Sequence, residues 1–186
     1  MDTKTLIIET ATTLFQQKGF KSVGLNEILN ACKITKGSMY HHFPNGKEEL
    51  LIACLRLMNE AITDDMQSIY SQYPTTLEAT RAMIDILMER FEKDGTITGY
   101  TFTSIVREME SLSEPVRNAS NLLYRQIIKI CSDKLVADGI PEDKAYSTAL
   151  MITASIEGGI LLSLSKNDTI PLQTVSQFLP NILKEI

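Results

Sequence analysis

The sequence has few of the residues that bind metals or form disulfides. Its three cysteines, Cys32, Cys54 and Cys131, are odd in number, far apart and without a C-x-x-C pair. This spacing argues against a disulfide framework and against a zinc site, so we expect reduced thiols that pack as small apolar groups. The only two histidines, His41 and His42, are adjacent. On a helix they point about 100° apart and make poor joint metal ligands. We expect no metal site and no cofactor.

Catalytic and membrane signals are also missing. The sequence has no Gly-rich phosphate loop, no H-x-x-x-H pair and no nucleophile-elbow motif, so we do not expect an enzyme. No run approaches the about 18 apolar residues that cross a bilayer. The N-terminal stretch MDTKTLIIETATTLF lacks the basic region and the cleavage site of a signal peptide. These absences predict a cytoplasmic protein with no membrane partner.

Helical periodicity is what the sequence has in abundance. Apolar residues make up 44% of the 186 residues, which is enough for a sizeable core. They recur at helical spacing, and no segment shows convincing strand alternation. Gly, Pro, Asn-Gly and Asp-Gly signals mark the ends of the periodic segments. We predict an all-α protein of about nine helices, at about 3–18, 25–32, 35–43, 47–71, 76–93, 103–110, 113–138, 141–166 and 172–185.

Charge divides the chain into two parts. Residues 1–46 hold five lysines against three carboxylates, a net charge of +2, together with both histidines. Residues 47–186 hold 13 basic and 20 acidic residues, a net charge of −7. A small anion-binding head on an acidic body would show this asymmetry. We therefore predict a DNA-binding domain at 1–46 and a larger helical effector-binding and dimerisation domain at 47–186.

The first three helices predict a helix-turn-helix head. The second and third are separated by a tight turn at Lys33-Ile34, and in such a head the third helix enters the DNA major groove. Met39, Phe43 and part of Tyr40 would anchor this helix to the core of the head. The polar face and the start of the next helix provide the predicted DNA contacts: Lys36, Gly37, Ser38, Tyr40, His41, His42 and Lys47.

These residues resemble the N-terminal domain of the TetR family of transcriptional repressors. The resemblance covers residues 3–55 and rests on TKGSMYHHF from Thr35, followed by KEEL from Lys47. Two features depart from the family pattern. Gly24 stands where the family usually has a capping Ser or Thr, which removes a hydroxyl contact to phosphate. The turn PNGK is one residue longer than the commoner P-x-K, a form similar to the branch of the lincomycin-resistance and flavonoid-responsive repressors.

The resemblance implies a homodimer whose heads bind a palindromic double-stranded operator. It places the interface on the last two helices. The sequence agrees independently, because residues 149–164 are apolar almost all round and 172–185 carry an apolar stripe. The alternative is a core helix within one chain. Gly158 and Gly159 indicate either a close helix approach at an interface or a cavity. The predicted interface residues are Ile152, Ile156, Gly159, Ile160, Val175, Phe178, Leu179 and Ile182.

The resemblance also implies a small-molecule effector pocket among the middle helices. Met adapts to irregular cavities and an aromatic ring suits a flat apolar ligand. Filling of the core is the alternative for each of these residues. Glu157 interrupts an apolar helix, so it needs a partner or a ligand group; it could equally face solvent or pair with Arg107 or Arg125. The predicted pocket residues are Met58, Met66, Met88, Tyr100, Phe102, Met109, Tyr124 and Glu157.

The sequence therefore predicts a TetR-like homodimeric repressor. It would leave its operator when a small apolar or aromatic molecule binds. The alternative function is a helical small-molecule-binding dimer that has lost sequence-specific DNA binding, which the missing cap at Gly24 and the weak charge of the head keep open.

Overall fold

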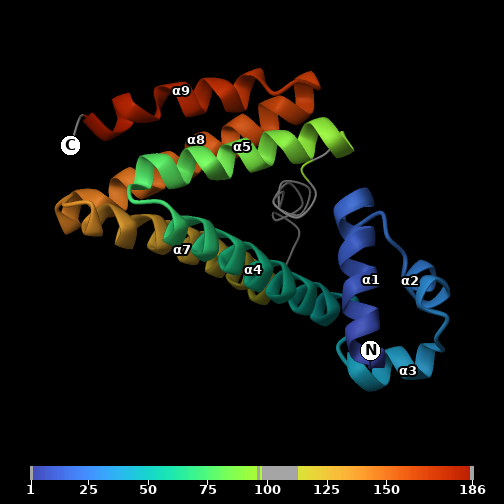
Figure 1. Ribbon diagram of the computed structural model, residues 1–186. Coiled ribbons are helices and arrows are strands. Elements are labelled where there is room, and N and C mark those ends of the chain that lie inside the picture. Colours follow the sequence, from blue (N-terminus) through green and yellow to red (C-terminus); the bar gives the residue numbers. More distant parts are fainter. Residues whose placement is uncertain (1, 96, 98–112, 185–186) are drawn as a thin grey trace. The chain divides into compact units, whose positions relative to one another are not determined.

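The computed structural model describes residues 2–95, 97 and 113–184 (Figure 1). Within these residues every regular element is an α-helix, so the predicted all-α class is confirmed. The helix expected at 103–110 lies outside the described residues. The helices are α1 (Thr3–Lys18), α2 (Leu25–Cys32), α3 (Lys36–His42), α4 (Lys47–Gln72), α5 (Thr76–Asp94), α7 (Glu114–Ala137), α8 (Glu142–Lys166) and α9 (Ile170–Lys184).

Local capping explains where these helices begin and end. The hydroxyl of Thr35 accepts a hydrogen bond from the Ser38 amide at 3.2 Å and starts α3. Gly19 ends α1 with a positive φ of 80°, its N–H bonded to the Phe15 carbonyl. Helix α9 begins at Ile170, earlier than predicted, because the Asp168 carboxylate accepts the Ile170 N–H at 2.8 Å.

The chain forms two compact units. The first comprises residues 1–61 and 99–123, and the second comprises 62–98 and 124–186. The first unit therefore contains the predicted head together with the start of α4. Its core is built from one face of each of its helices, including Ile7 and Phe15 of α1, Ile28 of α2, Met39 of α3 and Leu50 of α4.

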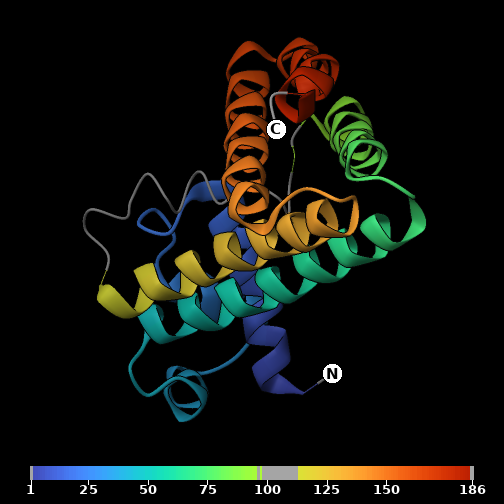
Figure 2. The ribbon, with the colours of Figure 1, turned by 90° about the vertical axis from the view of Figure 1, so that its left-hand side faces the viewer.

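The second unit is organised around α8 and α9, which lie side by side (Figures 1 and 2). A Cβ atom added at Gly159 would lie 3.1 Å from Cδ2 of Leu172 and 3.2 Å from Cγ2 of Val175. Gly159 therefore serves the close approach of α9 within one chain. Helix α8 is long and apolar enough to cross a membrane by length and composition alone, a test that core helices of soluble proteins also pass.

Two hydrogen bonds hold the turn between α4 and α5 against the end of α7. The Asp138 carboxylate accepts the Thr76 N–H at 2.6 Å, at the first turn of α5. The Lys134 ammonium donates to the Tyr73 carbonyl at 2.7 Å. Both bonds satisfy backbone groups that the turn leaves without a helical partner. They fix the entry of the chain into α5.

The three cysteines are free and buried. Burial raises the pKa of Cys54 to about 12 and that of Cys131 to about 11. At pH 8 the reactive thiolate is therefore roughly a thousandth or less of either residue. We expect iodoacetamide at pH 8 to leave Cys54 and Cys131 of the folded protein largely unmodified over an hour, as followed by peptide mass spectrometry. The same protein in urea, as control, should be alkylated at every cysteine. Rapid modification of the folded protein at these two sites would contradict this expectation.

Candidate nucleic-acid interface

The turn between α2 and α3 has a defined helix-turn-helix geometry. Lys33 adopts a left-handed conformation with φ of 55°, and its N–H bonds back to Asn30 and Leu29 carbonyls. The Ile34 N–H donates to the Leu29 carbonyl at 3.1 Å. This pair of bonds closes α2 with a Schellman-type cap. Helix α3 begins at Lys36, three residues after this cap at Lys33.

Helix α3 separates its residues onto two faces as the sequence predicted. Met39 is fully buried, and Phe43 just after the helix is 1% exposed. On the other face Tyr40 is 41% exposed. The remaining predicted contacts of α3 lie on or beside this open face: Lys36, Gly37 and His41 are exposed, and Ser38 and His42 are partly exposed. Helix α3 therefore presents a continuous polar and aromatic surface that no other described segment covers.

Two side-chain arrangements organise this surface. The Lys36 ammonium lies 5.9 Å from the centre of the Tyr40 ring, within the range of a cation–π contact. The rings of His41 and His42 meet edge to face, with centres 5.1 Å apart. Donors for phosphate oxygens are thus gathered at both ends of a single seven-residue helix.

Gly24 caps α2 without a side-chain hydrogen bond, in agreement with the departure seen in the sequence. No described atom lies within 4 Å of the place where a Cβ would stand. The Glu27 and Ile28 amides donate to the Gly24 carbonyl. The start of α2 is therefore held by backbone bonds and by the ion pair between Lys18 and Glu27, whose Nζ and Oε1 are 2.5 Å apart.

Lys47, one of the predicted DNA contacts, begins α4 as predicted. Its ammonium turns into the head and donates a hydrogen bond to the Phe20 carbonyl. It lies 4.1 Å from the centre of the Phe20 ring and 5.8 Å from that of Phe15. The first turn of α4 also carries Glu48 and Glu49. Their negative charges would repel a phosphate group at this end of the helix. The open face of α3 therefore does not include the Lys47 ammonium.

Among the predicted effector residues that the structure describes, two lie close together. Glu157 of α8 and Tyr124 of α7 are close enough to influence each other's ionisation, and burial raises the pKa of Glu157 to about 7. Burial also raises the pKa of Tyr124, as does the nearby Glu157 carboxylate. Met58 and Met66 are buried in the two separate units and Met88 is partly buried. Tyr100, Phe102 and Met109 lie outside the described residues, as does Arg107, one of the partners proposed for Glu157.

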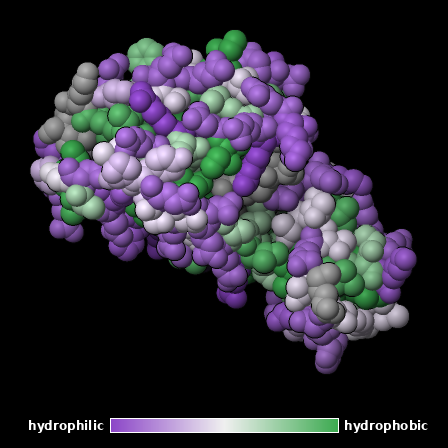
Figure 3. All heavy atoms as spheres, viewed as in Figure 1, coloured by the Kyte–Doolittle hydropathy of each residue, from purple (hydrophilic) through white to green (hydrophobic). Residues whose placement is uncertain are grey.

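The predicted interface residues divide into covered and open ones. Ile152, Ile156, Ile160 and Leu179 are buried within the chain itself, and Gly159 lies against α9. Val175 and Ile182 are partly buried, whereas Phe178 is 56% exposed. The exposed leucine and methionine residues of α8 are different ones, and they are Leu150, Met151, Leu161 and Leu162. We call these four residues together with Phe178 the open apolar face. Figure 3 shows how apolar residues reach the surface between hydrophilic ones on one side of the molecule.

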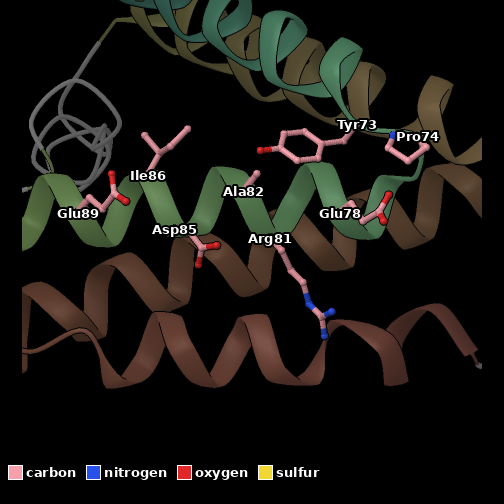
Figure 4. Close-up of a pocket in the computed structure, with 8 residues that line it drawn as sticks. All are labelled: Tyr73, Pro74, Glu78, Arg81, Ala82, Asp85, Ile86 and Glu89. Atoms are coloured by element: carbon pink, nitrogen blue, oxygen red, sulfur yellow. The ribbon is translucent and has the colours of Figure 1, made fainter.

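A surface hollow of about 510 Å³ lies along α5 (Figure 4). Its lining combines apolar groups with carboxylates and one guanidinium, from Tyr73, Pro74, Glu78, Arg81, Ala82, Asp85, Ile86 and Glu89. The Glu78 carboxylate is already used, because it accepts the Thr75 hydroxyl at 3.0 Å as part of the cap of α5. None of the predicted effector residues lines this hollow, and no motif in the sequence marks it.

Two family models match the chain. Residues 7–54 match the model of bacterial regulatory proteins of the tetR family. Residues 76–178 match the C-terminal domain of LmrA/YxaF-like transcriptional regulators. The first match contains the helix-turn-helix, and the second covers more than half of the chain.

Individual proteins resemble the chain over nearly its full length. The HTH-type transcriptional regulator LmrA of Bacillus subtilis is 33% identical over 183 residues, covering 98% of this chain and 97% of LmrA. The uncharacterized regulator YxaF of the same organism is 30% identical, with coverage of 99% and 96%. The crystal structure of reduced Escherichia coli NemR superposes with a TM-score of 0.89 at 24% identity, covering 97% and 96% of the two chains. The chain belongs to the TetR family of DNA-binding transcriptional regulators, in its LmrA/YxaF-like group.

Proposed function

We propose that the protein is a homodimeric repressor of the cytoplasm that binds a palindromic operator. It leaves the operator when a small apolar or aromatic effector binds to its helical body. The division of α3 supports the DNA-binding part of this proposal most directly. Met39 and Phe43 fasten the helix to the head while Lys36, Tyr40 and His41 remain open, as a helix that enters the major groove requires. The related NemR protein of Escherichia coli is named a transcriptional repressor.

The open apolar face supports the dimer. Leu150, Met151, Leu161 and Leu162 recur at helical spacing along α8, with the small residues Ala154 and Gly158 between them. No described atom lies within 4 Å of the Cβ position of Gly158, so a second helix can approach closely there. A second copy would cover this face symmetrically, as in most homodimers.

The effector part of the proposal rests on Glu157 and Tyr124. A half-buried carboxyl group beside a phenol in an otherwise apolar region can orient one polar group of a ligand. Met66 and Met88 belong to the same compact unit as this pair, and methionine side chains adapt to irregular apolar ligands. The ligand class is therefore a flat, largely apolar molecule with at least one hydrogen-bonding group.

Selection from genomic DNA tests this function. The purified protein is mixed with fragmented DNA of its source organism at about 100 mM salt, and the retained fragments are sequenced. We expect enrichment of a palindrome with half-sites one helical turn or a multiple apart. Tyr40→Ala should weaken binding to that site by about tenfold or more, because each of the two heads loses one exposed contact to the DNA. Tyr73→Ala is the matched control, since Tyr73 is similarly exposed (38%) but lies on the α4–α5 turn.

The outcomes separate the two candidate functions. Equal binding of Tyr40→Ala and the natural protein to the selected site would contradict the assignment of α3 as the recognition helix. A folded dimer that enriches no sequence, with and without candidate effectors, would instead favour the alternative of a small-molecule-binding dimer without sequence-specific DNA binding.

A further inference from the structure

The loop between α1 and α2, residues 19–24, positions the DNA-reading part of the head. It begins at Gly19, whose φ of 80° requires glycine, and it buries Phe20 and Val23. The Phe20 ring meets the Phe15 ring edge to face, with centres 5.3 Å apart. The loop then leads directly into α2 through Gly24, which offers no side-chain cap. The placement of α2, and of α3 after its tight turn, therefore depends on how this loop is held.

Lys47 holds this loop from the first residue of α4. Its ammonium donates to the Phe20 carbonyl, a partly buried backbone acceptor that no helix satisfies. The same ammonium faces the Phe20 ring at 4.1 Å and the Phe15 ring at 5.8 Å. A carbonyl dipole and two aromatic rings together replace much of the water that a free ammonium would keep. This arrangement joins α1, the loop and α4 at one point.

We infer that Lys47 is a positioning residue of the DNA-binding head and not a phosphate contact. It anchors the loop of residues 19–24 onto α4, and through the loop it sets how α2 and α3 meet DNA. Two lysines that look equivalent in the sequence thus have different roles. Lys36 is exposed at the start of α3, whereas Lys47 is used inside the head. The inference rests on the proposed DNA binding where it is tested by the salt dependence of binding. The test by hydrogen exchange needs no DNA.

The salt dependence of DNA binding distinguishes these roles. Each phosphate contact contributes about −0.9 to the slope of log K against log salt. Each bound dimer carries two copies of Lys36, so we expect Lys36→Met to reduce the steepness of this slope by about 1.8. Lys47→Met, which keeps the length of the apolar chain, should weaken binding about tenfold at every sequence with the slope unchanged. A slope reduced by about 1.8 in Lys47→Met, with the loop unaffected, would show a phosphate contact in each head and overturn the inference.

Hydrogen exchange tests the anchor without DNA. Amides of residues 19–24 should exchange about tenfold faster in Lys47→Met, while those of α9 and those of the same loop in Lys36→Met remain as in the natural protein. Unchanged exchange in Lys47→Met would overturn the inference whether or not the protein binds DNA. Failure of the natural protein to bind any DNA would count against the proposed function alone.

A second variant, Phe20→Leu, covers the case in which Lys47→Met folds poorly. Phe20→Leu keeps the lysine but removes the ring nearest to its ammonium. We expect Phe20→Leu to reproduce both effects, with faster exchange of the loop and weaker DNA binding at an unchanged slope. Where both single variants fold, the combined variant should lose clearly less affinity than the sum of the two single losses, because both disrupt the same anchor of the loop. Additive losses would indicate that Lys47 acts on DNA separately from Phe20, and would overturn the inference.

Discussion

Leu162→Glu is expected to convert the protein from a dimer into a monomer. Leu162 is 52% exposed on α8, and it belongs to the open apolar face with Leu150, Met151, Leu161 and Phe178. If a second copy covers this face, a glutamate there must lose its water with no opposite charge to meet it. Twofold symmetry would place two such carboxylates in one interface. The dimer should weaken by about 3 kcal/mol or more, which is over a hundredfold in its dissociation constant.

Sedimentation or light scattering measures this result directly, because one chain has a mass of 20.8 kDa. The single chain itself should stay folded, since the substituted side chain already faces outward. Leu122→Glu is the matched control, as Leu122 of α7 is 45% exposed but lies outside the open apolar face. The interface would have to be sought elsewhere if Leu122→Glu dissociated the dimer and Leu162→Glu did not.

The helices could be predicted from the sequence because particular residues mark where each helix begins and ends. Thr35 caps α3, Gly19 and Gly95 end α1 and α5, and Lys47 begins α4. Each of these signals acts through the backbone of its own neighbours, so no tertiary information is needed. The open face of α3 could also be predicted, because a short helix with two apolar anchors can bury only one side.

The orientation of α8 could not be predicted in this way. Its apolar residues occupy nearly the whole circumference, so periodicity does not distinguish the side that meets α9 from the side that stays open. The sequence therefore assigned Ile152, Ile156 and Ile160 to the interface, whereas the chain itself buries them. Of the two adjacent glycines, Gly159 faces α9 and Gly158 faces open space. A rotation of about 100° separates these two environments.

The directions and partners of long side chains could not be predicted from the sequence for a different reason. The direction of the Lys47 ammonium depends on where the Phe15 and Phe20 rings lie, and these come from α1 and the loop after it. The partner of Glu157 is likewise 33 positions away in the chain, at Tyr124. The sequence could mark Glu157 as unusual because it interrupts an apolar helix. Only the packing of α7 beside α8 supplies its phenol.

Glu157→Gln is expected to make the protein more stable at pH 8 and to leave it unchanged at pH 4.5. Burial raises the pKa of Glu157 from 4.5 to about 7 in the folded chain. Between these two values the folded chain keeps a proton that the unfolded chain has released. The free energy of unfolding therefore falls as pH rises through this window and levels off above pH 7. The full difference corresponds to roughly 3 kcal/mol, and some relaxation around the carboxylate lowers the expected gain to about 2 kcal/mol.

Urea unfolding at pH 5, 6, 7 and 8 and at one protein concentration measures this effect. Glutamine stays neutral and keeps a side-chain oxygen that can accept a hydrogen bond from the Tyr124 hydroxyl, so the variant should lose the contribution of this residue to the pH dependence. Glu89→Gln, at an exposed position of α5, controls for the loss of one charge.

Tyr124→Phe gives a second test with the opposite sign. The Tyr124 hydrogen bond lowers the pKa of Glu157 because it stabilises the carboxylate. Its removal should therefore raise that pKa further and increase the loss of stability between pH 5 and pH 8. If Glu157→Gln were instead less stable than the natural protein at pH 8, the carboxylate would be ionised and paired in the folded chain. The polar group offered to an effector would then be a charge, and a cationic ligand would fit it better than a neutral phenol or alcohol.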